Sequence, residues 1–315
     1  MEFILISTTS KHDSDILRLP SRNVLDQTSE NFLISSKKKL MEFISQSSEH
    51  SVFLADCEKK QGLSIYDELV QENLKVLDYK PNDLTMEAAD LTILNYVDQE
   101  ISGKSVGVYG TGNIAFKLAL RLSERNANIY LYGRNEKKIK VCVDALKQIS
   151  FDETLIHYGT PNSKLDVLVS LVSSDEVITE DFIQTLNPKS LCLDGGIGNF
   201  SKSFIESALK QGHDVRRLDV RQSQEIMDGY INSRINSQFD SIIGRAEIES
   251  VSVVAGGIMG REGELIVDSI SSPSKVIGVA NGIGGVKGES HLNDEEKRKI
   301  KKIQSYIEQD CQKNT

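Results

Sequence analysis

This sequence lacks the features that mark membrane and secreted proteins. No apolar run approaches the roughly 18 residues that a membrane-spanning helix needs. The first residues, MEFILISTTSKHD, contain neither the basic start nor the long apolar core of a signal peptide. We therefore expect a cytoplasmic protein with no membrane partner.

Cysteine and histidine are scarce and scattered. The four cysteines, none of which belongs to a C-x-x-C pair, are Cys57, Cys142, Cys192 and Cys311. The five histidines, which show no metal-binding spacing, are His12, His50, His157, His213 and His291. Cysteines placed like this fit reduced cytosolic thiols better than a disulfide framework or a zinc site, so we expect no metal.

An excess of positive charge is also lacking. The 37 Lys and Arg are outnumbered by 46 Asp and Glu, and the net charge of −9 argues against a nucleic-acid-binding surface. With 315 residues, 39% of them hydrophobic and 26% charged, the composition predicts an ordinary globular protein of two domains. The expected partner is a small-molecule substrate, and a homodimer is left open.

One stretch, Lys104–Asn135, has the organisation of a nucleotide-binding unit. Val106–Tyr109 has the pattern of a buried strand, a helical pattern begins near Ile114, and Ile129–Tyr132 has the pattern of a second strand. Between the first strand and the helix lies a G-x-G-x-x-A turn made of Gly110, Thr111, Gly112, Asn113, Ile114 and Ala115. This order of elements within one short segment is the context that the dinucleotide-binding motif requires.

The small residues of this turn each have a physical role. Gly110 lets the chain turn sharply off the strand, and Ala115 lets the helix pack closely on the strand. Gly112 has no side chain to keep a pyrophosphate from the amides of the helix N-terminus, where the helix dipole favours an anion. The turn therefore predicts a dinucleotide site, although a packing turn without a ligand has the same residues.

The end of the second strand indicates which dinucleotide would bind. An NAD site usually has Asp or Glu there, to accept hydrogen bonds from the adenosine ribose. This chain has Gly133, Arg134 and Asn135 instead. A guanidinium can pair with a 2′-phosphate through two parallel hydrogen bonds, so Arg134 favours NADP over NAD. The alternative is an ordinary solvated arginine.

The remaining sequence alternates between strand and helix patterns up to about residue 220. Before the central stretch we predict strands at 3–6, 51–56 and 74–79 and helices at 36–45 and 85–100. After it we predict helices at 136–148 and 203–210, a further helix capped by Thr179, and strands at 155–158, 165–172, 190–194 and 215–219. The alternation predicts an α/β fold: a doubly wound parallel sheet of Rossmann type, with a second, smaller α/β domain.

Three regions follow from this pattern. We expect an N-terminal α/β substrate domain at 1–100 and a dinucleotide-binding domain at 101–220, followed by a glycine-rich segment with a C-terminal helix at 221–315. Residues 251–290 hold nine of the 22 glycines, which indicates either turns near a ligand or tight helix packing. The last helix, over about 293–309, is expected to pack back on the cleft and on the N-terminal domain.

Two segments of the central region resemble a known superfamily. They are LDVLVSLVSS, starting at Leu165, and TLNPKSLCLDGGIGN, starting at Thr185. Over about residues 85–220 the chain resembles the NADP-binding domain of glutamyl-tRNA reductase and shikimate dehydrogenase, within the amino-acid-dehydrogenase-like superfamily. The second segment is also similar to long-chain acyl-carrier-protein reductase.

The resemblance implies further cofactor contacts. The segment that would border the nicotinamide ribose is Ser170, Leu171, Val172, Ser173 and Ser174. The residues that would lie at the carboxyl end of the neighbouring strand, facing an inter-domain cleft, are Asp194, Gly195 and Gly196. Open α/β sheets bind ligands at this end in any case.

The same relatives suggest candidates for catalysis. Shikimate dehydrogenase pairs a lysine with an aspartate, and here Lys59 or Lys60 could be the lysine. The aspartate could then be Asp83, next to Asn82, or Asp90. The two reductases use a cysteine nucleophile, for which Cys57 is the candidate because the charges of Lys59 and Lys60 would favour its thiolate.

We therefore predict an NADP-dependent oxidoreductase that transfers a hydride between nicotinamide and a small carbonyl, imine or thioester. The cofactor would carry the hydride, and the protein would orient it against the substrate. An alternative is a protein that binds NAD(P) without net redox turnover, as a lyase, a cyclodeaminase or a sensor. A degenerate domain used for assembly is the third alternative.

Overall fold

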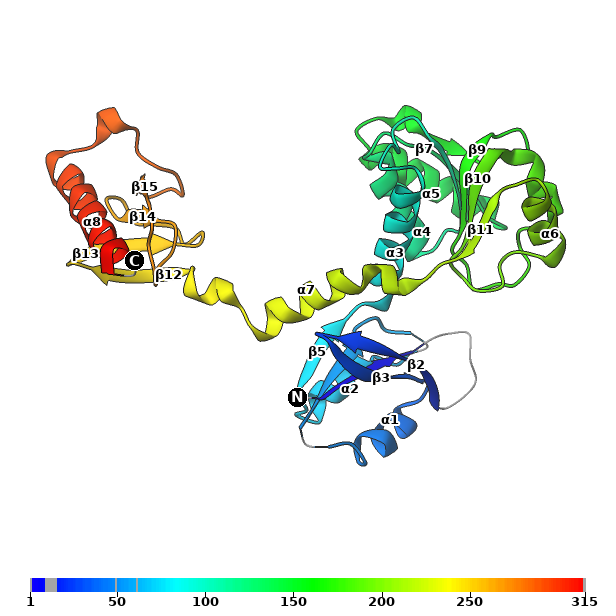
Figure 1. Cartoon of the computed structure of the whole chain (residues 1–315), viewed down its shortest axis with the longest axis horizontal. Helices are drawn as coiled ribbons and strands as arrows, with labels where there is room; N and C mark the ends of the chain where they lie inside the picture. Colours follow the sequence, from blue (N-terminus) through cyan, green and yellow to red (C-terminus); the bar gives the residue numbers. More distant parts are fainter. Residues whose placement is uncertain (1, 9–15, 49, 61, 314–315) are drawn as a thin grey trace. The chain divides into compact units, whose positions relative to one another are not determined.

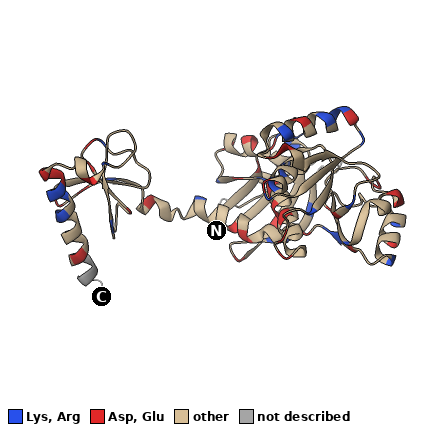
Figure 2. Ribbon diagram, turned by 90° about the horizontal axis from the view of Figure 1, so that it is seen from above, with Lys and Arg blue, Asp and Glu red and all other residues tan. Residues whose placement is uncertain are grey.

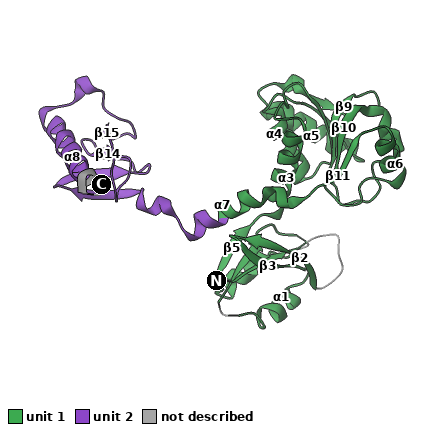
Figure 3. Ribbon diagram, in the orientation of Figure 1, with its two compact units in different colours: residues 1–230 green, residues 231–315 purple. Residues whose placement is uncertain are grey.

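The protein divides into two compact units, Met1–Tyr230 and Ile231–Thr315 (Figure 3). The structure is a computed structural model that describes residues 2–8, 16–48, 50–60 and 62–313. Among these residues, no helix combines the length and the apolar character that crossing a membrane requires. Each unit is described by itself.

The first unit begins with a five-stranded sheet in the order β2-β3-β1-β4-β5 (Figure 1). Its strands are β1 (Glu2–Ser7), β2 (Ile16–Val24), β3 (Gln27–Ile34), β4 (Ser51–Asp56) and β5 (Val76–Tyr79). All neighbouring strands are parallel except β2 and β3, which form an antiparallel hairpin. The strands predicted for β1, β4 and β5 are confirmed, but the hairpin was not predicted.

Three helices accompany this sheet or follow it. They are α1 (Lys37–Ile44), α2 (Ile65–Gln71) and α3 (Pro81–Tyr96). Ser36 and Ser64 cap the first two through their hydroxyl groups, as short polar side chains commonly do. Helix α3 begins four residues before its predicted start, because Pro81 takes a first-turn position, where a missing N–H costs nothing.

The centre of the first unit is a six-stranded, fully parallel sheet in the order β11-β10-β9-β6-β7-β8. Its strands are β6 (Ser105–Tyr109), β7 (Asn128–Tyr132), β8 (Ile156–Tyr158), β9 (Leu165–Ser170), β10 (Leu186–Asp194) and β11 (Asp214–Arg217). Numbered from β6, the order across the sheet is 3-2-1-4-5-6, which is that of the doubly wound dinucleotide-binding fold. The predicted fold class is therefore confirmed.

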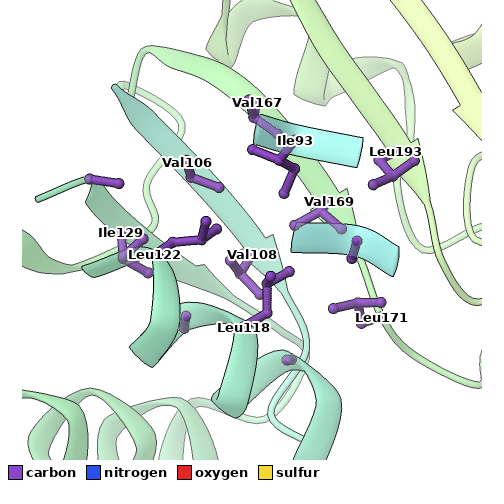
Figure 4. Packing of buried hydrophobic residues seen from close by; sticks show 14 of the residues in the cluster. Ile93, Val106, Val108, Leu118, Leu122, Ile129, Val167, Val169, Leu171 and Leu193 are labelled. Carbon is purple, nitrogen blue, oxygen red and sulfur yellow. The ribbon is translucent and has the colours of Figure 1, made fainter. Parts of the chain in front are cut away.

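Helices α4 (Asn113–Ser123) and α5 (Glu136–Ile149) pack with α3 on one face of this sheet. The core between them is made of aliphatic side chains, and Figure 4 labels Ile93, Val106, Val108, Leu118, Leu122, Ile129, Val167, Val169, Leu171 and Leu193. The other face is covered by α6 (Lys202–Lys210) around Phe200 and Phe204. The helix expected after Thr179 is only a 3₁₀ turn, Glu180–Thr185.

A buried carboxylate joins α3 to α4. Asp90 is 3% exposed and pairs with Arg125 and with Arg121, the latter at 3.4 Å between Nη1 and Oδ2. We expect Asp90→Ala to lower the free energy of unfolding by about 2–3 kcal/mol, because it leaves the partly buried Arg125 without its carboxylate and Arg121 with Glu87 alone. Urea denaturation of the full chain, followed by circular dichroism, measures this loss.

Asp83 on the same helix is the matched control. Its ion pair with Lys117 is more than one-third exposed at both ends, so Asp83→Ala should cost less than about 1 kcal/mol. Equal losses in the two variants would contradict the role of burial at Asp90.

The second unit contains a four-stranded sheet that was not predicted. Its strands are β12 (Gly244–Ile248), β13 (Val251–Ala255), β14 (Leu265–Val267) and β15 (Val276–Val279). Helix α8 (Asp294–Lys313), where a helix was predicted, packs on this sheet through Ile303 and Ile307. Helix α7 (Gln224–Ile235) spans the boundary between the units.

Several glycines of the second unit have a backbone that other residues rarely adopt. Gly256, Gly263 and Gly282 have φ values of 66°, 85° and 80°, and each lies in a connection between or after strands. The glycine density of 251–290 thus serves turns in a small sheet.

Acidic and basic residues are interspersed over both units, and α8 begins with acidic residues that are followed by basic ones (Figure 2). The packing of α8 on the N-terminal domain stays a prediction.

Candidate functional site

The glycine turn leaves the carboxyl end of β6, the central strand of the parallel sheet. Gly110 has φ 151°, and a Cβ built on it would lie 3.0 Å from the Leu171 carbonyl oxygen and 3.1 Å from Ala115 Cβ. Ala115 itself is fully buried. The turn is therefore as tight as its sequence predicts, and larger side chains would push β6, α4 and the end of β9 apart.

Gly112 shows the opposite environment, because a Cβ built on it would have no atom within 4 Å. It stands at the N-cap of α4, and no side chain caps this helix. Helices α1, α2, α5 and α6 are each capped by their own Ser or Asn. The first amides of α4, from Asn113 to Ala115, have no acceptor within the helix and can bind an anion. The turn therefore fits a pyrophosphate.

A cavity of about 490 Å³ adjoins this turn, a volume within the range of small-molecule sites. Its lining comes from the ends of three strands and the start of α5: Tyr109, Gly110, Thr111, Gly133, Arg134, Asn135, Lys138 and Val172. Arg134 and Lys138 give the cavity two positive charges. The structure thus brings the predicted glycine turn and the predicted Arg134 to one site.

Two other residues of the predicted site serve the protein's own structure. The Asn135 side chain caps α5, since its Oδ1 accepts a hydrogen bond from the Lys138 amide at 3.0 Å. Ile114 packs against the core beneath the sheet. Lys138 was not named from the sequence, although its place one turn into the helix after Arg134 was visible there.

The buried side-chain amide of Asn199 holds the segment after β9 in place through hydrogen bonds. Ser170 is fully buried and donates to Asn199 Oδ1 at 2.9 Å. Asn199 Nδ2 donates to the carbonyls of Val172 and Ser174, at 3.0 and 2.8 Å. Leu171 belongs to the core, and of this segment Val172 is the residue that lines the cavity.

The Asp194 side chain binds the backbone of the loop that directly follows it. Its carboxylate accepts hydrogen bonds from the amides of Gly196, Gly198 and Asn199, at 2.8–3.1 Å. Asp194 therefore holds the loop after β10 in place, and its predicted contact with a cofactor stays a prediction.

The two glycines after Asp194 are needed for close packing. A Cβ on Gly196 would lie 2.0 Å from the Val172 carbonyl oxygen, and one on Gly195 would lie 3.0 Å from that of Ser170. These glycines bring the β10 loop against the segment after β9. Their role in the structure is thus to shape one wall of the site.

The lysine candidates lie at the carboxyl end of β4. Lys60 Nζ is 2.7 Å from Asp56 Oδ2 and 3.6 Å from Glu58 Oε2, and the Asp56 side chain is fully buried. Asn82, at the start of α3, donates to Glu58. Lys59 is exposed. The structure therefore assembles Asp56, Glu58, Lys60 and Asn82, a polar cluster in which the carboxylate partners of Lys60 are not the predicted ones.

The aspartate candidates are engaged elsewhere. Asp83 pairs with Lys117 on α4. Asp90 is buried between α3 and α4 with Arg121 and Arg125. Neither forms the lysine–aspartate pair proposed for Lys59 or Lys60. The sequence placed Asp90 on a helix but could not show that Arg121 of α4 and Arg125, just after this helix, would reach it.

Cys57 follows β4 and is half-buried. Burial raises the pKa of its thiol, and among the nearby cations it is Lys80 that opposes this effect. The expectation that Lys59 and Lys60 activate its thiolate is therefore not supported.

A raised pKa favours the neutral thiol over the thiolate at neutral pH. We expect iodoacetamide to alkylate Cys57 with an apparent pKa above that of a free thiol in the same buffer, as measured by peptide mass spectrometry across a pH series. An apparent pKa below that of the free thiol would restore Cys57 as a nucleophile.

Cys142, Cys192 and His213 pack within the structure of the first unit. Burial raises the pKa of Cys192 to about 12, and Cys142 packs under the glycine turn with its Sγ 4.0 Å from the Thr111 carbonyl oxygen. His213 is buried and accepts from the Ser190 amide. His12 and the Cys311 side chain lie outside the described residues. Within the part of the chain that is described, no three His, Cys, Asp or Glu residues gather as metal ligands.

Several solved structures are similar to this protein. No protein-family model matches the sequence, and a search of curated proteins finds no match. The similar structures include a dipicolinate synthase from Bacillus subtilis, with 14% identity and a TM-score of 0.39. The similarity covers 75% of this protein's chain and 78% of the synthase chain.

Two dehydrogenases are similar over comparable lengths. A shikimate dehydrogenase in complex with NADP⁺ has 10% identity and a TM-score of 0.43. The similarity covers 75% of this protein and 96% of the shikimate dehydrogenase chain. L-tryptophan dehydrogenase from Nostoc punctiforme has 13% identity and a TM-score of 0.43, with corresponding coverage of 67% and 63%. The fold assignment itself stands on the strand order of the parallel sheet, which identifies a doubly wound α/β protein of Rossmann type.

Proposed function

We propose that this protein is an NADP-dependent oxidoreductase that transfers a hydride between nicotinamide and a small carbonyl, imine or thioester. One observation carries the proposal. The uncapped, unobstructed N-terminus of α4 lies at the carboxyl end of the central strand, beside a cavity with two cations. That is where a doubly wound sheet binds a dinucleotide.

The cavity supports NADP as the cofactor rather than NAD. Arg134 and Lys138 line it, and the three residues between β7 and α5 include no carboxylate. Two cations favour a phosphate on the adenosine ribose, which a carboxylate at this place would repel. When bound, the cofactor would supply or accept the hydride.

Lys60 is our candidate for moving the proton that accompanies the hydride. It lies after β4 of the N-terminal sheet, and Asp56 and Glu58 hold its ammonium group in place. We expect Lys60→Met to abolish turnover without changing the affinity for NADPH. Lys59→Met, which alters the exposed neighbour, should leave turnover intact. Loss of turnover in Lys59→Met alone would reverse this assignment.

Oxidation of NADPH tests the reaction directly. The full chain is incubated with NADPH and a panel of oxo acids, imines and acyl thioesters, and absorbance at the nicotinamide band is followed. We expect steady consumption with at least one substrate class. Binding of NADPH without any consumption across the panel would remove the oxidoreductase from consideration.

A protein that binds NAD(P) without net turnover, such as a sensor, a lyase or a cyclodeaminase, is the second candidate. It is favoured by the finding that Asp83 and Asp90 are engaged in ion pairs and that the pKa of the Cys57 thiol is raised. Such a protein would bind NADP as tightly as we expect but would not consume it. A cytoplasmic location remains part of the proposal, and a homodimer stays open.

A further inference from the structure

Arg134 spans the proposed nucleotide site. Its Nη2 donates a hydrogen bond to Ser174 Oγ at 2.7 Å. Arg134 follows β7 and Ser174 follows β9, and these two strands are not neighbours, because β6 lies between them. The side chain of Arg134 therefore crosses above the end of β6, the strand from which the glycine turn departs.

Two further observations place the guanidinium over the cavity. Arg134, Tyr109 and Val172 line the same hollow beside Gly110. Burial raises the pKa of Tyr109, the last residue of β6, and the charge of Arg134 is the influence that opposes it. The guanidinium of Arg134 is thus close enough to the end of β6 for its charge to act on the Tyr109 hydroxyl.

The two residues of this hydrogen bond, Arg134 and Ser174, differ in how far their side chains can move. The Ser174 carbonyl accepts from the buried side chain of Asn199 at 2.8 Å, which also holds the Val172 carbonyl. Arg134 is an exposed side chain on several rotatable bonds. Ser174 is therefore the fixed anchor, and Arg134 is the arm that can move.

We propose that the Arg134–Ser174 hydrogen bond is a latch over the nucleotide site, and that Ser174 thereby lowers the affinity for every nucleotide that has to open it. A dinucleotide that lays its pyrophosphate on the glycine turn has to pass between the ends of β7 and β9, and so has to break this bond. Only a nucleotide with a phosphate on its adenosine ribose offers the released guanidinium a new partner. The inference rests on the proposed function and deepens it.

The latch leads to an expectation that a simple phosphate clamp does not share. Ser174→Ala should bind both NADP⁺ and NAD⁺ more tightly, by roughly 3- to 10-fold, since neither nucleotide then has to break the bond. Arg134→Ala should bind NADP⁺ more weakly, by roughly 10-fold or more, and NAD⁺ more tightly, by roughly 3- to 10-fold. If Arg134 only clamped a phosphate, both variants would bind NAD⁺ as the wild type does.

Calorimetric titration of the full chain with NADP⁺ and NAD⁺ tests the latch, in wild type, Ser174→Ala and Arg134→Ala. Ser102→Ala is the matched control, because it removes the hydroxyl of an exposed serine at the opposite, amino end of β6. Thermal unfolding followed by circular dichroism confirms that each variant is folded. Adenosine 2′,5′-bisphosphate and adenosine 5′-diphosphate serve as shorter probes of the same contact.

Tighter NAD⁺ binding in both variants, with wild-type binding in the control, supports the latch. Unchanged NAD⁺ affinity in both variants overturns it, and so does weaker binding of both nucleotides to Ser174→Ala, which would make Ser174 a ligand contact. If the wild type binds neither nucleotide, the proposed function fails first and the latch fails with it.

Discussion

Gly112→Val should lower the affinity for NADP⁺ by about 100-fold or more while leaving the thermal unfolding midpoint unchanged. The backbone at Gly112 is extended, with φ −91° and ψ 178°, so valine can adopt it. The space around its Cβ is open, so the added methyl groups displace no protein atom. They would instead occupy the place of the pyrophosphate. Losing two charge-assisted hydrogen bonds to the amides of α4 corresponds to about 3 kcal/mol, or roughly 100-fold.

Gly229→Val is the matched control for this variant. Gly229 lies in α7 of the first unit, and a Cβ built on it also has no atom within 4 Å. The same substitution there should leave NADP⁺ binding unchanged. Calorimetry measures the affinities and circular dichroism the unfolding midpoints. Wild-type affinity in Gly112→Val would show that the amides of α4 bind no nucleotide.

Arg134→Glu should reverse the preference between the two nucleotides. The change removes a guanidinium that can pair with the 2′-phosphate and puts a carboxylate in its place, which repels the phosphate and can accept from the ribose hydroxyls. We expect the NADP⁺ affinity to fall by about 100-fold, equivalent to roughly 2.7 kcal/mol, while NAD⁺ binding is kept or improved. Competition between the two nucleotides in a fluorescence titration measures the ratio of their affinities.

Lys137→Glu separates this effect from a change in overall charge. Lys137 is exposed on α5, three residues from Arg134, and does not line the cavity. Its reversal makes the same change in charge and should shift the ratio of affinities only slightly, because exposed charges are screened. An unchanged NADP-to-NAD ratio in Arg134→Glu would refute our choice of cofactor.

The central sheet could be predicted because each of its elements has a local signal. Val106–Tyr109 and Ile129–Tyr132 are apolar strands on either side of a helix with a regular apolar face, and the glycine turn marks the junction. The β2–β3 hairpin gave no such signal, since Pro20 interrupts β2 and Leu25, the first turn residue, is unusual for its positive φ of 47°. The sheet of the second unit was hidden by short strands between glycines.

The site was predicted where a backbone motif determines it and missed where distant side chains do. Gly110, Gly112 and Arg134 are placed by the turn and by the end of β7, which the sequence shows directly. Asn199 joins Ser170, which lies 29 residues away, and only the parallel pairing of β9 with β10 brings them together. The resemblance assigned Asp194 to the cofactor, but it could not show the backbone amides that bind this carboxylate, because they lie in a loop without a regular pattern.

Calorimetric titration of the unmodified full chain with NADP⁺ and then with NAD⁺ tests the central claim most directly. We predict one saturable site per chain for NADP⁺ and markedly weaker binding of NAD⁺. No heat of binding from either nucleotide at millimolar concentration would contradict the claim that the turn after β6 holds a dinucleotide, and with it the proposed function.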